Sequence, residues 1–184
     1  MAPSHTATNG QTPSPAFSTS STIPLWLDGR EVKTSSTFDV VSPLDHTVLY
    51  QCSSAGEEDV TKAIAAAAQA FKSWSQTKPN ERRDIFLRAA DEFKRRRDEL
   101  FHYSHTETGA PESLFAFEHN LAYEACKSVA GLIQTALTST MPVVADQGKS
   151  AMLIKEPYGV VLGIAPWNAP NVLGLRACLQ PLAM

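Results

Sequence analysis

The sequence has no excess of basic residues and no long apolar run. Among its 184 residues, 16 Lys and Arg stand against 19 Asp and Glu, which gives a formal net charge of −3. Binding to nucleic acid through phosphate contacts requires a surplus of cations, so this balance argues against a nucleic-acid partner. No stretch approaches the roughly 18 apolar residues that predict a transmembrane helix, and we expect no membrane partner.

Cysteine is scarce, and its pattern excludes two kinds of cross-link. Cys52, Cys126 and Cys178 are odd in number, far apart and form no CxxC motif. Neither a disulfide framework nor a zinc site is therefore predicted, and a reducing compartment fits. His102 and His105 could share a metal on one helix face, but no further ligand has matching spacing, so we expect no metal site.

Charged side chains are also missing from the start of the chain, apart from His5. Residues 1–22 are mostly Ser, Thr, Pro, Ala and Asn, a composition that predicts a disordered tail. No Lys or Arg precedes Arg30, which argues against a mitochondrial presequence, and no apolar segment favours secretion. We expect a cytoplasmic protein whose ordered domain spans residues 23–184.

Short apolar segments separated by turn residues open the ordered part. Asp28-Gly29 lies between two apolar arms in LWLDGREV, which is a strong hairpin signal. FDVVSP (38–43) and HTVLYQC (46–52) predict two further strands. We therefore expect a small antiparallel sheet.

Helical patterns follow. Residues 56–74 are rich in alanine and begin with three acidic residues, which suit a helix N-terminus. Residues 79–107 predict one long second helix, which Pro79 opens and Gly109 ends. A third helix is predicted from Ser113 to Thr138. Its expected core residues are Leu114, Phe117, Leu121, Ala125, Val129, Leu132 and Leu137.

Two strands and a helix are predicted near the C-terminus. Residues 150–157 have a strand pattern, and YGVVLGIAP (158–166) is continuously apolar, as in strands that a parallel sheet buries on both faces. A helix is predicted from Asn171. The turn between strand and helix lies where α/β proteins place ligands.

That turn contains Asn168 between Pro166 and Pro170. The prolines restrict the backbone on either side, so the asparagine is held in one orientation. Its amide offers two donors without a charge, which suits stabilisation of a developing oxyanion. The alternative is that Asn168, or the Pro170 region, caps the next helix. The residue pattern leaves both interpretations open.

KEPYGVVLGIAPWNAPNVLGLR (155–176) resembles the signature strand and turn of the aldehyde dehydrogenase superfamily. The upstream segments LWLDGREV, FDVVSP, WSQTKPNERRDIFLRAADEF and ETGAP follow the order found in that family, so the resemblance covers residues 23–184. Within the family, the segment is most similar to the branch that oxidises salicylaldehyde and vanillin.

The resemblance implies an α/β fold: the N-terminal portion of the aldehyde dehydrogenase fold, with a small antiparallel sheet, helices and the first strand of a Rossmann-like parallel nucleotide-binding sheet. It implies NAD- or NADP-dependent oxidation of a small-molecule aldehyde to a carboxylic acid, with aromatic aldehydes among the candidate substrates. Asn168 then takes the catalytic oxyanion role. Ile164, Ala165, Pro166 and Trp167 occupy positions along the nicotinamide end of the cofactor cleft.

The same resemblance implies that the chain is incomplete. In the family, the nucleophilic cysteine, the general-base glutamate and most of the cofactor site lie beyond this segment, and all three cysteines here are expected to be structural. A second interpretation is therefore a truncated fragment that is inactive alone. Its unpaired apolar strand edge would favour aggregation or partner pairing, as a homo-oligomer or on a full-length homologue.

Overall fold

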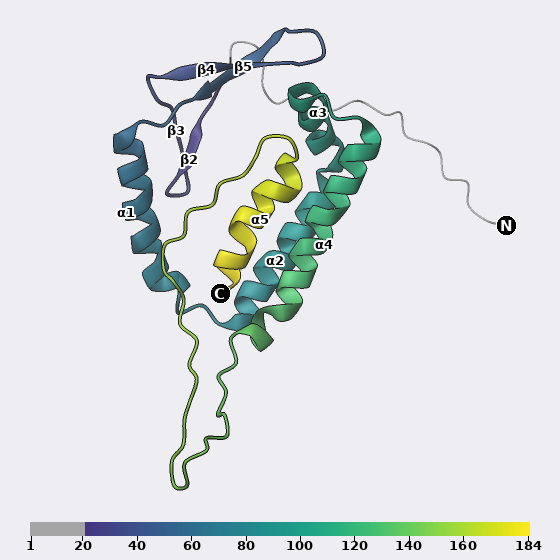
Figure 1. Ribbon diagram of the computed structural model, residues 1–184. Coiled ribbons are helices and arrows are strands. Elements are labelled where there is room, and N and C mark those ends of the chain that lie inside the picture. The colour runs from purple at the N-terminus through teal and green to yellow at the C-terminus, as the bar shows by residue number, and fades with distance from the viewer. Residues whose placement is uncertain (1–20) are drawn as a thin grey trace, which may run out of the picture.

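The structure is a computed structural model that describes residues 21–184. The predicted disordered tail, residues 1–22, lies outside the described residues except for Ser21 and Thr22. Short strands lie at one end of the molecule and helices form its body (Figure 1). The elements are β1 (Thr22–Ile23), β2 (Leu25–Leu27), β3 (Arg30–Val32), β4 (Thr37–Val41), β5 (Val48–Ser53), α1 (Glu57–Trp74), α2 (Pro79–Arg95), α3 (Arg97–Thr108), α4 (Glu112–Ala136) and α5 (Pro170–Ala183).

The strands confirm most of the predicted pairings. β2 and β3 form an antiparallel hairpin. Asp28 and Gly29 at its tip have φ angles of 52° and 70°, as the favoured two-residue hairpin turn requires. β4 and β5 pair antiparallel, as predicted. β1 joins β5 in parallel, so the three-stranded sheet β1-β5-β4 is mixed rather than purely antiparallel.

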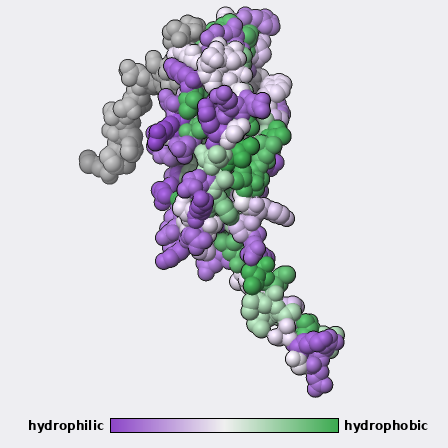
Figure 2. Space-filling model, turned by 90° about the vertical axis from the view of Figure 1, so that its left-hand side faces the viewer, coloured by the Kyte–Doolittle hydropathy of each residue, from purple (hydrophilic) through white to green (hydrophobic). Residues whose placement is uncertain are grey.

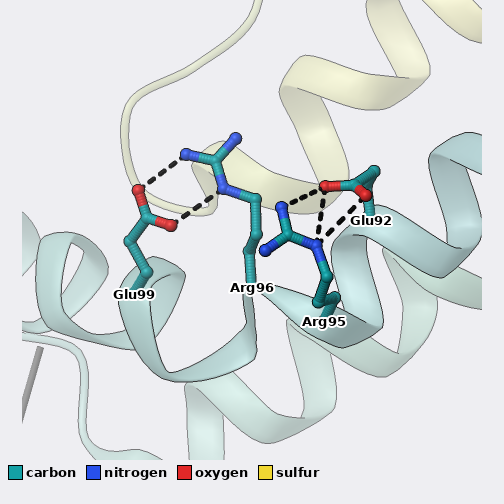
Figure 3. A network of polar contacts seen from close by, with 4 residues as sticks. All are labelled: Glu92, Arg95, Arg96 and Glu99. Carbon is teal, nitrogen blue, oxygen red and sulfur yellow. Dashed lines mark hydrogen bonds and ion pairs between the residues drawn. The ribbon is translucent and has the colours of Figure 1, made fainter.

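The predicted second helix is divided into two. Arg96 lies between α2 and α3 with φ −95° and ψ 18°, outside the helical region. Arg95 bonds to Glu92 of α2, whereas Arg96 bonds to Glu99 of α3, so neighbouring arginines pair with opposite sides of the break (Figure 3). The change of direction allows α3 to pack on α4, where the rings of Phe101 and Phe115 lie 5.2 Å apart.

α4 confirms the third predicted helix but buries a different face. The large side chains of Leu114, Phe117 and Leu132, expected in the core, are exposed. Ala125, Val129 and Leu137, also expected there, are only partly buried against the core, whereas Cys126, Ala130 and Ile133 are fully enclosed where α4 packs against α2 and α5. The main core cluster comprises Phe86, Ala90, Cys126, Ala130, Ile133, Leu179 and Ala183.

Residues 137–169 form a long excursion between α4 and α5, called the arm below. Part of it projects away from the helices, and its last part returns beside α5 (Figure 1). The predicted strand at 150–157 is reduced to one bridge between Thr140 and Leu153. Residues 158–166 pair with no strand among residues 21–184 and are exposed rather than buried on both faces, which leaves the unpaired apolar edge expected of a first sheet strand without its neighbours.

Candidate functional site

The turn before α5 leaves the predicted asparagine unengaged. Trp167 and Asn168 form the turn, Ala169 is the N-cap residue of α5, and Pro170 is its first residue. Pro at this position suits a helix start because its missing N–H would have no helical acceptor. The Asn168 side chain is exposed and makes no hydrogen bond to any of residues 21–184. The interpretation of Asn168 as the cap of this helix is therefore wrong, whereas the Pro170 region does begin it.

A carboxylate from another helix caps α5 instead. Oε1 of Glu118, on α4, accepts hydrogen bonds from the backbone N–H of Asn171 at 2.5 Å and of Val172 at 3.2 Å. The Asn171 side-chain amide also donates to Ser104 Oγ of α3 at 2.9 Å. A carboxylate at this place satisfies orphan N–H groups and interacts favourably with the helix dipole. Sequence analysis missed both residues: the only signal for Glu118 was a carboxylate within an apolar helical pattern, and Ser104 had no signal.

The other end of α5 is held by a buried cation. Arg82 of α2 is only 3% exposed. Its Nη1 donates to the carbonyl of Ala183 at 3.2 Å, and its Nη2 donates to the carbonyl of Trp74 at 2.9 Å. Trp74 Nε1 in turn donates to the carbonyl of Leu182 at 3.0 Å. A carboxylate therefore lies at the N-terminus of α5 and a guanidinium at its C-terminus, which complements the dipole at both ends.

The predicted cofactor residues lie on the segment that leads into this turn. Gly163 approaches α5 so closely that a Cβ at this position would be 2.7 Å from the carbonyl oxygen of Ala177. Beyond this contact the chain is open to solvent, since Ile164 is 82% exposed and Trp167 is 77% exposed. Ala165 and Pro166 between them are exposed as well. The structure therefore brings Ile164, Ala165, Pro166, Trp167 and Asn168 together on one exposed stretch.

A cleft of about 1010 Å³ lies beside this stretch, between α1, α5 and the returning part of the arm. Its lining is largely apolar and includes Phe71, Trp74, Val160 and Val161. Of the predicted site residues, only Ala165 lines it. Figure 2 looks onto the face that carries α1 and shows hydrophobic surface on this face and along part of the arm.

None of the three cysteines has the setting of an activated thiol. Burial raises the pKa of the thiols of Cys52, Cys126 and Cys178, which lowers their thiolate fraction at neutral pH. Cys126 is fully buried in the core, and the Sγ of Cys178 lies 3.3 Å from the carbonyl oxygen of Leu175 in its own helix.

Residues 21–184 contain no cluster of three or more His, Cys, Asp or Glu that could hold a metal ion. No helix in that range is long and apolar enough to cross a membrane.

These features define an α/β protein in which a side-chain amide without a hydrogen bond to the described residues precedes a helix whose two ends are held by buried charges. The chain belongs to the aldehyde dehydrogenase family, because the sequence profile described as "Aldehyde dehydrogenase family" matches residues 30–184. The fold class is confirmed, and it corresponds to the N-terminal part of the aldehyde dehydrogenase fold.

Individual relatives agree with this assignment. Vanillin dehydrogenase from a Pseudomonas species is 40% identical over 169 residues, which cover 88% of this chain and 34% of that protein. The crystal structure of a salicylaldehyde dehydrogenase from Pseudomonas putida complexed with salicylaldehyde aligns with a TM-score of 0.82 at 27% identity, covering 88% of this chain and 34% of that one. An NAD-dependent aldehyde dehydrogenase from Sinorhizobium meliloti aligns with a TM-score of 0.82 at 27% identity, covering 94% and 35%. The chain thus spans about a third of the length of these relatives.

Proposed function

We propose that this chain supplies the oxyanion donor and part of the cofactor cleft of an NAD(P)-dependent aldehyde dehydrogenase. The observation that supports the proposal is the Asn168 side chain, which is exposed and free of hydrogen bonds to residues 21–184. It lies between two prolines and directly before a helix that Glu118 anchors. An amide that is fixed in place and unpaired is available to donate to substrate.

Asn168 acts on the substrate oxygen in this proposal. When a thiolate adds to an aldehyde carbon, the carbonyl oxygen gains negative charge, and the Asn168 Nδ2–H donates a hydrogen bond to it. Because the amide is neutral, it favours the charged intermediate without first attracting anions. The pKa of all three cysteines is raised, so the nucleophile is proposed to come from outside residues 21–184.

The exposed apolar side chains of Ile164 and Trp167, with Ala165 and Pro166, fit a surface for a flat nicotinamide ring. NAD or NADP, when bound, supplies the hydride acceptor. For the substrate we propose an aromatic aldehyde, since two of the similar proteins are named for vanillin and salicylaldehyde.

A chimera tests this proposal. Residues 23–184 replace the matching third of the Pseudomonas vanillin dehydrogenase, and aldehyde-dependent NADH or NADPH formation is measured. We expect an active chimera whose kcat falls by about 10²- to 10³-fold on Asn168→Ala. Asn120→Ala, an exposed asparagine on α4, is the matched control and leaves kcat unchanged. A folded chimera that oxidises no aldehyde, or one that is indifferent to Asn168→Ala, contradicts the proposal.

The second candidate function is docking of an inactive chain on a full-length homologue. The observation that favours it is the extended apolar segment, in which Val160, Val161 and Leu162 are exposed and have no ladder partner among residues 21–184. Such an edge favours strand pairing with another chain. Co-purification with the homologue supports this candidate, while self-association would identify a homo-oligomer and a stable monomer without a partner would contradict both.

A further inference from the structure

We propose that Glu118 is the positioning residue of the Asn168 turn and that it acts together with Asn171 and Ser104. The proposal rests on the proposed oxyanion role of Asn168. Neither Glu118 nor Ser104 forms a hydrogen bond with residues 164–168; both bond to the first turn of α5, which follows Asn168 directly.

The burial of Glu118 is the first observation. Its residue is only 2% exposed, and within residues 21–184 it forms no ion pair with a basic side chain. A buried carboxylate without a cation is costly unless hydrogen bonds stabilise its charge. Here both bonds come from the N-terminal N–H groups of α5, at 2.5 and 3.2 Å, so the charge of Glu118 is stabilised only when α5 begins at this place.

Asn171 carries the second observation. Its backbone N–H is bound to Glu118 of α4, and its side-chain amide donates to the buried Ser104 of α3. A residue bound to two different helices by its main chain and its side chain has little freedom to shift. Asn168 lies three positions earlier, with Pro170 between them, so the anchor fixes the C-terminal side of the turn.

The N-terminal side of the turn is fixed independently by the close approach of Gly163 to Ala177 of α5. Asn168 therefore lies on a short loop whose two ends are both held against α5, and Glu118 sets where α5 begins. This matters because an oxyanion donor has to be held within about 0.5 Å of its productive position, and a misplacement of about 1 Å can cost about 100-fold in rate.

The structural part of the test uses the 184-residue chain itself and amide hydrogen exchange. Glu118→Ala is expected to speed exchange of the Asn171 and Val172 N–H by about 10- to 100-fold, the factor for losing charge-assisted bonds. It is also expected to shift the NMR resonances of the Asn168 side-chain amide. Glu118→Gln keeps an acceptor oxygen and should restore most of the protection. Glu124→Ala, on the exposed face of the same helix, is the control.

The kinetic part of the test uses the chimera described above. If Glu118 acts through Asn168, Glu118→Ala lowers kcat by about tenfold or more and leaves KM within about twofold, because the oxyanion forms after the substrate binds. It also has little further effect in an Asn168→Ala background. A role in fold stability alone would instead lower the fraction of folded enzyme and leave the kcat of the folded fraction unchanged.

The outcomes separate this inference from the proposed function. An active chimera in which Asn168→Ala abolishes turnover but Glu118→Ala does not lower kcat overturns the inference alone. Full activity of Asn168→Ala overturns the proposed function. If Glu118→Ala does not fold, Asn171→Ala and Ser104→Ala decide, since both keep the Glu118 bonds to the backbone. Each is expected to shift the Asn168 amide resonances, with no larger shift when the two are combined, and unchanged resonances contradict the proposal.

Discussion

Replacing Arg82 by methionine should separate the two helix ends that its guanidinium joins. The side chain donates from Nη2 to the last residue of α1 and from Nη1 to the last residue of α5, and its Cζ lies 5.5 Å from the centroid of the Trp74 ring. Methionine keeps most of the apolar stem of arginine. The Arg82→Met variant therefore removes the charged donors while changing the packing little.

The magnitude follows from opposing terms. Two hydrogen bonds from a charged donor contribute about 3–4 kcal/mol together, and the contact with the Trp74 ring adds about 0.5 kcal/mol. Against this, burial of the guanidinium lowers the pKa of Arg82, and its buried Nε has no acceptor among residues 21–184, which costs about 1–2 kcal/mol. We expect Arg82→Met to lower the free energy of unfolding by about 2 kcal/mol, and Arg82→Lys, which can reach one carbonyl, by about half of that.

Urea unfolding followed by circular dichroism measures this free energy. Arg83→Met is the matched control, because Arg83 is the next residue on the same helix but is half-exposed and, within the described part of the chain, pairs only with its neighbour Asp84. Its expected effect is below about 0.5 kcal/mol. Equal unfolding midpoints for Arg82→Met and the wild type, or an equal loss in Arg83→Met, would refute the reasoning.

Three further predictions concern packing, backbone contact and charge. Ile133→Ala in the core should cost about 2–5 kcal/mol of unfolding free energy in urea titrations, and an effect below about 1 kcal/mol would contradict the core assignment. Gly163→Ala should destabilise the chain because its Cβ meets a backbone carbonyl, whereas Gly174→Ala, in α5 with open space around it, should stabilise the chain by about 0.5–1 kcal/mol. If the Gly163→Ala variant melted at the higher temperature, the close approach of Gly163 to α5 would be excluded. Hydrogen bonds from Arg95 and Arg96 lower the pKa of Glu92 and Glu99 below 4.5. The contribution of these pairs to stability is therefore present above about pH 4.5 and is lost as the pH falls through the lowered pKa. Carboxyl ¹³C titration by NMR should find both midpoints below 4.5, and ordinary midpoints would argue against the pairs.

Local signals in the sequence predicted the local elements. Asp28-Gly29 predicted the hairpin because a turn with two positive φ angles is set by the residues within it. Acidic N-terminal residues predicted the bounds of α1 to within one residue, and apolar periodicity predicted those of α4 to within two. The break at Arg96 had no such signal, since arginine is a good helix former and the division depends on where α3 packs.

Features that depend on distant partners were not predictable in this way. The buried face of α4 is set by the close approach of α2 and α5, which encloses Cys126, Ala130 and Ile133. The sequence indicated the Asn168 turn and left two roles for its side chain. Only the structure excluded the capping role, because the acceptor that replaces it, Glu118, lies far away in sequence. Apolar content predicted that residues 158–166 are buried on both faces, but that burial needs neighbouring strands, which residues 21–184 do not supply.

The arm has a consequence for how the fold tolerates variation. It joins α4 to α5, and its projecting part lies away from the helices that it connects (Figure 1). Closing a loop costs only about 0.6 kcal/mol more for each doubling of its length. Insertions or deletions in the loop that the Thr140–Leu153 bridge closes should therefore change the entropy of loop closure slightly and leave the contacts between α4 and α5 intact. The projecting part of the arm can therefore gain or lose residues at little cost in stability, whereas the number of residues on either side of Asn168 cannot change without displacing it.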